Sequence, residues 1–342
     1  MSYIKSKKKL EQGGIDRVYF LHGTQTFLME DITQQVIAKA AVEQENVITY
    51  SLLDTPLELA VEEAETFPFF GGKKIVIVQD FFFVTSQKPE GKIEHDLSRL
   101  ERYLTSPLPE SILLLVSPYE KLDERKKITK ALKEHAAVVD CAPFDAKMTE
   151  EWLEDQAREK GFQFSGRGKE HLLERVGPQL LLLASEIEKL ALYVGENGQV
   201  DEDVVALLVA RSLEQDVFAL LDLAVKQQAH EALLLYHDLL KKKEEPLKLL
   251  VLIARQLRIY YQVKELTRRA YSQKQMAAQL KLHPYVVKLA SQQAGRFEDR
   301  QLLTLLKQCA DTDYAIKSGK VDKVLGVELL LLKLASASIQ HA

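Results

Sequence analysis

Hydrophobic and polar positions follow two alternating patterns between residues 18 and 141 of the chain. Short runs of mostly β-branched and leucine residues are apolar at successive positions, as in strands that are buried on both faces of a sheet. These runs cover residues 18–21, 47–50, 75–78, 112–117 and 137–141. Helical periodicity occupies the stretches between them, at residues 30–41, 57–65, 96–104 and 124–134. Strand and helix in alternation predict a parallel sheet that is covered by helices.

Beyond residue 141 the strand signals stop, and the sequence favours helices alone. Thr149 can cap a helix that Gly161 ends. Trp152, in the first turn of this helix, has the character of a core residue. Further helical stretches follow at residues 169–176, 179–194 and 201–210. Together these segments predict a small helical domain.

From residue 216 onward, apolar positions recur with the 3.6-residue period of amphipathic helices. Val217, Leu220, Leu221 and Ala224 give the spacing i, i+3, i+4 and i+7. Comparable stripes run through residues 247–266, 302–310 and 327–334. Pro246 can open one of these helices. The last third of the chain is therefore predicted to be an all-helical bundle.

Length and composition are those of a globular protein with several domains. The chain has 342 residues, of which 46% are apolar and 28% charged. Its changes of pattern divide it into an α/β domain at residues 1–143, a small helical domain at 144–212 and an all-helical domain at 213–342. No apolar run approaches the ~18 residues of a membrane span. The N-terminal lysines lack the apolar stretch of a secretory signal, so we expect a cytoplasmic protein without membrane contact.

Charge and cysteine content narrow the candidate chemistry. The net charge is −4, but Lys and Arg exceed Asp and Glu from residue 213 onward. A basic domain in an acidic protein weakly favours a phosphate-backbone partner, whereas its simplest interpretation is a solvated helical surface. Cys141 and Cys309 lie too far apart in sequence for a CxxC-type zinc site, and they fit a reducing compartment.

Residues 18–23, followed by a helix, have the strand, turn and helix order of a phosphate-binding loop. A working loop of the GxxxxGK[ST] type needs a second glycine, a lysine for the β- and γ-phosphates and a hydroxyl for Mg²⁺. Counted from Gly23, those positions hold Leu28, Met29 and Glu30. We interpret the loop as structural, with Leu28 and Met29 in the core.

No catalytic or metal-binding constellation stands out in the sequence. Asp80 ends an apolar run, as an acid does in the Mg²⁺-binding strand of a nucleotide hydrolase, but three phenylalanines follow it and a catalytic glutamate is absent. The eight histidines are scattered. We therefore predict no catalytic residues, no metal site and no cofactor.

The segment 272–290 has the pattern of a helix-turn-helix. Ser272 can cap a first helix, with Gln275 returning the hydrogen bond, and Met276 and Leu280 point inward. A proline then opens a second helix, which could enter a major groove of DNA. The same pattern occurs in plain helical hairpins, where it serves only core packing.

Phe67, Pro68, Phe69 and Phe70 stand between an acidic helix and a strand, and the sequence Gly-Gly-Lys-Lys follows them. Loops run over the surface and favour polar residues, so three phenylalanines around a proline are unusual. The rings either form an exposed aromatic wedge or fold back under the sheet as core residues.

Segments throughout the chain resemble one family, the delta subunit of the bacterial DNA polymerase III clamp loader. They occur in the family's order and span nearly the whole chain, so that the series is specific although no single segment is. The segments are YFLHGTQTFLMED, FPFFGGKKIVIV, KLDERKKITKALK, GPQLLLLASEIEKLALY, EQDVFALLDLAV, KKKEEPLKLLVLIARQLR, DTDYAIKSGKVD and VELLLLKL.

The resemblance implies an AAA+-type module, made of a RecA-like domain and a small helical lid, followed by a C-terminal helical collar. It also implies a subunit that does not hydrolyse ATP, in agreement with the altered phosphate loop. In this family, hydrophobic residues between the acidic helix and the third strand insert into a pocket of the ring-shaped sliding clamp. Their pattern falls here on Phe67, Phe69 and Phe70.

The expected protein is thus a non-catalytic clamp-loader subunit that binds the β sliding clamp and opens or traps one ring interface. Its collar is expected to join the motor and delta-prime subunits, and primed DNA is a secondary contact within the assembly. Two alternatives stay open. One is an active AAA+ ATPase with an unusual phosphate loop, and the other is a helix-turn-helix DNA-binding regulator built on residues 272–290.

Overall fold

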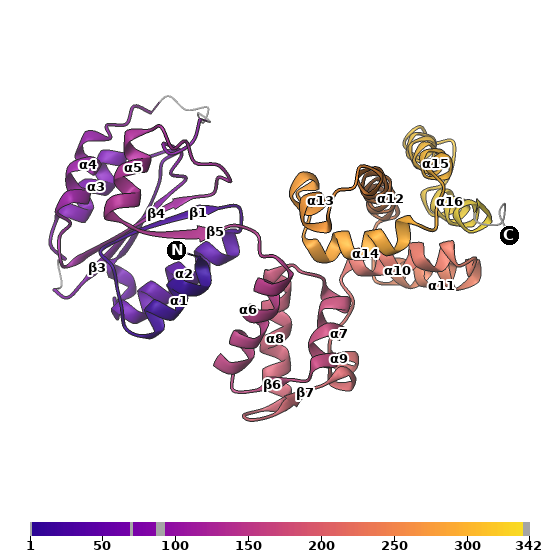
Figure 1. Cartoon of the computed structure of the whole chain (residues 1–342), viewed down its shortest axis with the longest axis horizontal. Coiled ribbons are helices and arrows are strands. Elements are labelled where there is room, and N and C mark those ends of the chain that lie inside the picture. Colours follow the sequence, from indigo (N-terminus) through magenta and orange to yellow (C-terminus); the bar gives the residue numbers. More distant parts are fainter. Residues whose placement is uncertain (1, 69–70, 87–92, 338–342) are drawn as a thin grey trace. The chain divides into compact units, whose positions relative to one another are not determined.

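The structure is a computed structural model that describes residues 2–68, 71–86 and 93–337. It divides into two compact units, residues 1–143 and 144–342 (Figure 1). The helices of residues 144–212 and those of residues 213–337 belong to the same second unit. In the part of the chain that is described, no helix has both the length and the apolar character needed to cross a membrane.

The first unit is built on a five-stranded parallel sheet, which confirms the α/β fold class. Its strands are β1 (Val18–Gly23), β2 (Val47–Ser51), β3 (Lys74–Gln79), β4 (Ser111–Ser117) and β5 (Ala137–Cys141). They lie in the order β2-β3-β4-β1-β5, and Phe20 of β1 pairs with Leu115 of β4 on one side and Val138 of β5 on the other. The central strands are buried on both faces, which explains their continuous apolar runs.

Helices cover both faces of this sheet (Figure 1). They are α1 (Tyr3–Glu11), α2 (Thr26–Ala40), the short 3₁₀-helix η1 (Gln44–Asn46), α3 (Leu57–Glu65), α4 (Ser98–Thr105) and α5 (Lys127–His135). Helices α1 and α2 lie together against β1 and β5, whereas α3, α4 and α5 share a core with the other face of the sheet. The sequence analysis did not predict α1, and α2 begins at Thr26 rather than at residue 30.

The second unit begins with four helices and one very small sheet. The helices are α6 (Ala146–Glu159), α7 (Gly166–Val176), α8 (Leu180–Val194) and α9 (Glu202–Leu208), and β6 (Gln163–Phe164) pairs with β7 (Gln199–Val200). The expectation that strands stop after residue 141 is therefore wrong, because runs of two residues are too short to show a period of two. Trp152 is buried, as predicted.

The predicted helix cap at Thr149 is also wrong. Asp145 caps α6, with its side chain accepting a hydrogen bond from the Met148 N–H at 2.9 Å. Thr149 lies one turn further on, and its hydroxyl donates to the Asp145 carbonyl. Both residue types favour this position, but the aspartate comes first in the chain and satisfies the free amides of the first turn.

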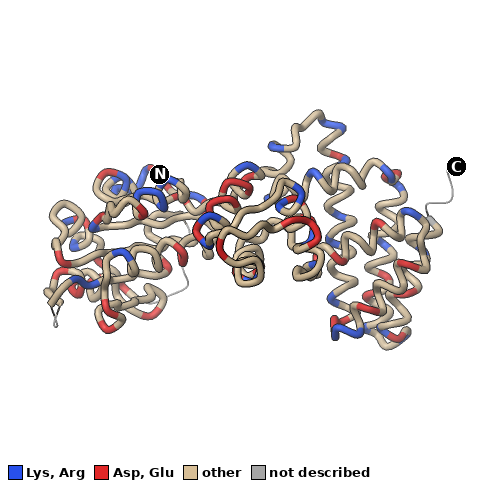
Figure 2. Tube along the Cα trace, turned by 90° about the horizontal axis from the view of Figure 1, so that it is seen from below, with Lys and Arg blue, Asp and Glu red and all other residues tan. Residues whose placement is uncertain are grey.

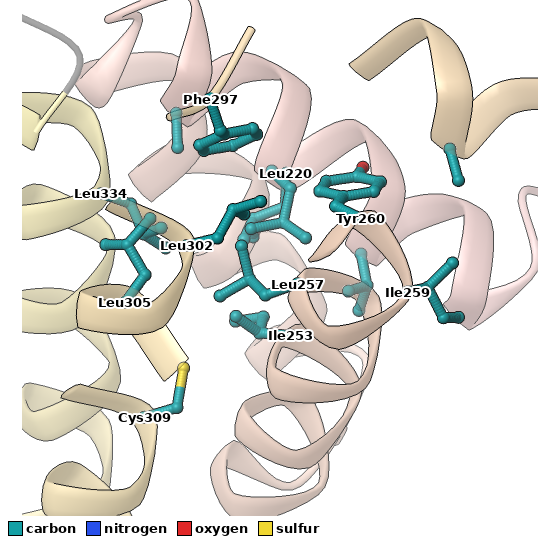
Figure 3. Close-up of a cluster of buried hydrophobic side chains, with 14 of the residues drawn as sticks. Leu220, Ile253, Leu257, Ile259, Tyr260, Phe297, Leu302, Leu305, Cys309 and Leu334 are labelled. Carbon is teal, nitrogen blue, oxygen red and sulfur yellow. The ribbon is translucent and has the colours of Figure 1, made fainter. Parts of the chain in front are cut away.

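Further helices follow in the described part of the second unit, up to residue 337, and bury a large apolar core. They are α10 (Leu213–Val225), α11 (Ala229–Lys241), α12 (Pro246–Arg268), α13 (Gln273–Leu280), α14 (Pro284–Ala294), α15 (Asp299–Lys317) and α16 (Lys323–Ala337). Figure 3 shows Leu257 of α12 pointing into this core, together with Leu220 of α10 and Leu302 of α15. Pro246 opens α12, as predicted.

Acidic and basic residues are interspersed along these helices (Figure 2). Several of them pair within one helix at i, i+4 spacing, for example Lys226 with Asp222 and Lys317 with Asp313. Such pairs stabilise exposed helical surfaces by about 0.3–0.5 kcal/mol each. The basic residues of these helices thus include some that pair with nearby acids, as on an ordinary solvated helical surface.

Candidate functional site

The connection between α3 and β3 carries the exposed phenylalanine of the candidate site. Phe67 has 69% of its surface exposed and does not fold back into the core, and Pro68 beside it is partly buried. The other two predicted site residues, Phe69 and Phe70, lie outside the described residues. An exposed aromatic ring in a short connection has the placement expected of a side chain that enters a partner's pocket.

A hydrogen bond and two glycines are described in the rest of this connection. The Gly71 N–H donates to the Pro68 carbonyl at 3.2 Å. Gly71 and Gly72 both have φ of +76°, and a Cβ atom at either would meet no other atom within 4 Å. These positions therefore need glycine for their backbone dihedral angles and not for lack of space.

A buried lysine lies at the base of the same connection. Lys74 is only 2% exposed, and its Nζ donates to Glu63 Oε1 at 2.7 Å and to Thr66 Oγ1 at 2.6 Å. The sequence analysis missed this cluster. Its one signal was a lysine at the start of an apolar strand, where a buried ammonium must find partners.

Beside the end of α3 there is a shallow polar pocket of about 490 Å³. It is lined by Glu65, Arg99, Arg102, Tyr103, Ser106 and Leu108. Arg99 donates to Glu65 Oε2 through both Nε and Nη2, at 2.9 and 2.6 Å, and pairs with Glu62 at 3.2 Å. Because its acids and bases pair with each other, this wall of the pocket is locally close to neutral.

The loop that resembles a phosphate-binding loop is filled by the chain itself. Gly23 has φ of +136°, and a Cβ atom there would lie 2.3 Å from the Cys141 carbonyl oxygen. The Gln25 N–H donates to that same oxygen at 3.1 Å. Leu28 and Met29 are buried, as predicted. This glycine is therefore explained by the close approach of the end of β5.

The phenylalanines after Asp80 belong to the core and its edge. Phe81 is fully buried, and Asp80 accepts a hydrogen bond from the Ser51 hydroxyl at 3.1 Å. His95 packs edge-on against Phe83 and accepts the Leu57 N–H at 3.1 Å, and burial lowers the pKa of His95. Within residues 2–68, 71–86 and 93–337, no three His, Cys, Asp or Glu side chains group as metal ligands.

The segment that resembles a helix-turn-helix is tied to α6. Ser272 and Gln275 form the predicted capping box at the start of α13. His283 caps α14 by accepting the Tyr285 N–H at 3.1 Å, and its Nε2 lies 3.0 Å from the Thr149 hydroxyl. Burial lowers the pKa of His283. This contact occupies the end of α14 that a helix-turn-helix would use to reach bases.

A row of exposed leucines follows one face of the last helix. Leu325, Leu329 and Leu332 of α16 have the spacing i, i+4 and i+7, and each is exposed. The residues between them that face the other way, such as Leu330 and Leu331, are buried in the core of the bundle. The row is thus a second apolar surface on a helix that already has a buried one.

Two family models match the chain. The model described as DNA polymerase III, delta subunit covers residues 19–142, and the model of the DNA polymerase III delta subunit, C-terminal domain covers residues 214–334. The matched ranges contain the exposed Phe67 connection and the row of leucines on α16.

Similarity to known proteins extends over almost the whole chain. DNA polymerase III subunit delta of Bacillus subtilis (strain 168) is 41% identical over 331 residues, which make up 96% of this chain and 95% of that protein. The solved structure of the Bacillus subtilis DNA clamp loader delta protein (YqeN) has a TM-score of 0.81 and 40% identity, covering 98% of this chain and 99% of that one.

Proposed function

The chain belongs to the family of DNA polymerase III delta subunits, and we propose that it binds the ring-shaped sliding clamp and opens or traps one interface of the ring. The observation that carries this proposal is the exposed Phe67 ring after α3. The resemblance of FPFFGGKKIVIV assigns clamp contact to Phe67, Phe69 and Phe70. Burial of such rings in a pocket of the clamp supplies the affinity.

Ring opening then follows from a difference between two affinities. A ligand shifts an equilibrium between a closed and an open ring only by the ratio of its affinities for the two forms. A subunit that grips the opened interface more tightly than the closed one therefore stabilises the open ring. No chemical step in this chain is needed, because ATP acts in the motor subunits.

The remaining partners are assigned to the helices of residues 213–342. We propose that these helices form the collar that joins the motor and delta-prime subunits, and that primed DNA is contacted within the cytoplasmic assembly. The exposed row Leu325, Leu329 and Leu332 supports an interface on α16, since an apolar stripe at helical spacing fits a partner helix. Leu325→Asp with Leu329→Asp should abolish co-elution with the motor subunits while leaving clamp affinity unchanged.

Clamp titrations with phenylalanine variants test the central proposal. Each phenylalanine that becomes fully buried contributes about 1.5–3 kcal/mol. Phe69→Ala with Phe70→Ala is therefore expected to weaken clamp binding by about two to four decades, and Phe67→Ala alone by about one to two decades. The matched control is Leu192→Ala, which removes an exposed apolar side chain of α8 and should change neither affinity nor melting temperature.

The outcome of these titrations is decisive when it is combined with thermal melts. Lost clamp binding with an unchanged melting temperature supports the wedge. Retained affinity in a folded variant that lacks all three rings contradicts the proposal. Early melting of the Phe69 and Phe70 variants would instead place those two rings in the core.

A further inference from the structure

The Lys74 ammonium is buried and hydrogen-bonded, unlike that of a typical surface lysine. Two hydrogen bonds, to Glu63 Oε1 and Thr66 Oγ1, hold it in a position where only 2% of the residue is exposed. A buried ammonium that loses such partners is strongly destabilised, so its geometry is tightly defined. We call the cluster of Glu63, Thr66 and Lys74 the base clip.

The base clip joins the two ends of the connection that carries Phe67. Glu63 lies in the last turn of α3, and Thr66 directly precedes Phe67. Lys74 is the first residue of β3, and its N–H donates to the Glu110 carbonyl at 2.9 Å, which fixes it to the sheet. A single side chain thus connects the end of the helix, the start of the connection and the start of the strand.

The Thr66 hydroxyl is the link on which this arrangement depends. It donates to the Glu63 carbonyl at 2.9 Å, which leaves its oxygen lone pairs to accept from the ammonium of Lys74. Because Thr66 itself is exposed, its hydroxyl can be removed without opening a cavity in the core. Glu63 is the second acceptor of the lysine and stays in place when the hydroxyl is lost.

We propose that Lys74 is a positioning residue for the clamp-binding connection, acting through the base clip to present Phe67 in the geometry that the clamp receives. This inference rests on the proposed function. Two glycines with positive φ follow Phe67 in the same connection, and such residues leave a chain conformationally free. Closing the two ends during folding lowers the entropy that binding must still overcome, and so raises affinity without a new contact.

This role differs from a contribution to global stability. Removal of the Thr66 hydroxyl leaves Lys74 paired with Glu63, and an apolar side chain in place of Lys74 removes the buried charge itself, so either change costs less than leaving the charge buried without any partner. The base clip should therefore show its effect in the protection of the Gly71 amide and in clamp affinity. The melting temperature should respond much less.

The first test measures the order of the connection without any clamp. In the full chain, Thr66→Val removes the hydroxyl and keeps the shape, whereas Thr66→Ser keeps the hydroxyl. Hydrogen exchange of the Gly71 amide, which donates to the Pro68 carbonyl, is expected to be about tenfold faster in Thr66→Val. Thr66→Ser should exchange like the parent protein. Equal exchange in all three proteins overturns the inference.

The second test measures clamp affinity and melting temperature of the same variants. Thr66→Val is expected to bind the clamp about tenfold more weakly under conditions where it is fully folded, and to melt somewhat earlier because the ammonium loses one acceptor. Thr66→Ser should stay within about twofold of the parent protein in affinity. Lys74→Met, which replaces the ammonium by an apolar group of similar length, should reproduce the Thr66→Val result. Affinity that falls only in step with melting temperature contradicts a positioning role.

Phe67→Ala separates a failure of this inference from a failure of the proposed function. If Phe67→Ala weakens clamp binding and Thr66→Val does not, the clamp remains the partner and the positioning role is wrong. If Phe67→Ala leaves clamp binding unchanged, Phe67 is not a clamp contact, and presenting it to the clamp cannot be the role of Lys74. The exchange measurement then still decides whether the base clip orders the connection.

Discussion

Connections that contain glycine lie at both ends of the strands of the parallel sheet, and they differ in what surrounds the glycine. We call the side where the strands end the carboxyl edge and the side where they begin the amino edge. At the carboxyl edge, Gly23 follows β1 and lies against the Cys141 carbonyl, where a Cβ atom would be 2.3 Å from the oxygen. At the amino edge, Gly71 and Gly72 precede β3, and a Cβ atom added at either would meet no other atom within 4 Å. Parallel sheets usually bind ligands beyond the carboxyl ends of their strands. In this chain the carboxyl edge after β1 is filled, and the exposed phenylalanine lies at the amino edge.

The comparison shows that a glycine in a strand-to-helix turn does not by itself indicate a phosphate site. At the carboxyl edge the backbone of β5 takes the space, and the Gln25 N–H is already bonded to Cys141. At the amino edge the glycines are explained by their dihedral angles alone, and the buried polar contacts lie at the base of the connection, where Lys74 is buried. Four measurements test this difference between the two connections.

Substitution of the glycines should give a large difference. Gly23→Ala forces a Cβ atom into a backbone carbonyl at a positive φ, so the free energy of unfolding should fall by more than about 3 kcal/mol. Gly71→Ala has space and pays only for its dihedral angle, about 1–2 kcal/mol. Chemical denaturation of the two variants makes the measurement. Equal losses would mean that the carboxyl edge is not filled as described.

Two phenylalanines in the segments before and after β3 should separate stability from binding. Phe81 is fully buried, whereas Phe67 is 69% exposed. Phe81→Ala is therefore expected to cost about 3–5 kcal/mol of unfolding free energy, and Phe67→Ala less than about 0.5 kcal/mol. Denaturant titration with a clamp-binding assay on both variants tests this. A large stability loss in Phe67→Ala would place its ring in the core.

The pH dependence of stability should report on the filled edge. Burial lowers the pKa of His22 in β1, with Lys133 acting in the same direction and Asp140 against it. Between the unfolded pKa of about 6.5 and the lower folded pKa, the unfolded chain binds more protons. The stability contributed by neutral His22 is therefore present above pH 6.5 and is lost as the pH falls below it.

Melting temperatures measured from pH 7.5 to pH 5 check this sign, with pH values chosen to span about one unit on either side of the unfolded pKa. His22→Gln should flatten the acid side of the curve, whatever its effect at pH 7.5. His230→Gln, which replaces an exposed histidine of α11, is the matched control substitution. A slope that is unchanged in His22→Gln would show that this residue titrates alike in both states.

The sequence predicted the elements better than their contacts. The apolar runs located all five strands of the large sheet. The central strands are buried on both faces, which gives a continuous apolar run, whereas the prediction of burial on both faces is wrong for β2 and β5, which are only partly buried. Helix α1 was not predicted, because its lysine-rich sequence shows no clear apolar stripe, and neither were the two-residue strands β6 and β7. For the candidate site, the sequence pointed to Phe67, whose role as a clamp contact stays a prediction, but it gave no indication of the base clip. Contacts such as that of Lys74 with Thr66 depend on tertiary approach, which periodicity does not encode.

The smallest expected effect is that of nucleotide on the isolated chain. A phosphate-binding loop needs free backbone amides, close approach of glycine and a lysine. Here the Gln25 amide is bonded to Cys141, the space beside Gly23 holds a carbonyl, and the lysine position is the buried Met29. Millimolar Mg-ATP should therefore leave the melting temperature unchanged. A ligand at 100 times its Kd would add about 2.7 kcal/mol of stability, which shifts a melt by several degrees. A Mg²⁺-dependent rise of that size, with an active motor subunit as the positive control, would show that the carboxyl edge still admits phosphates.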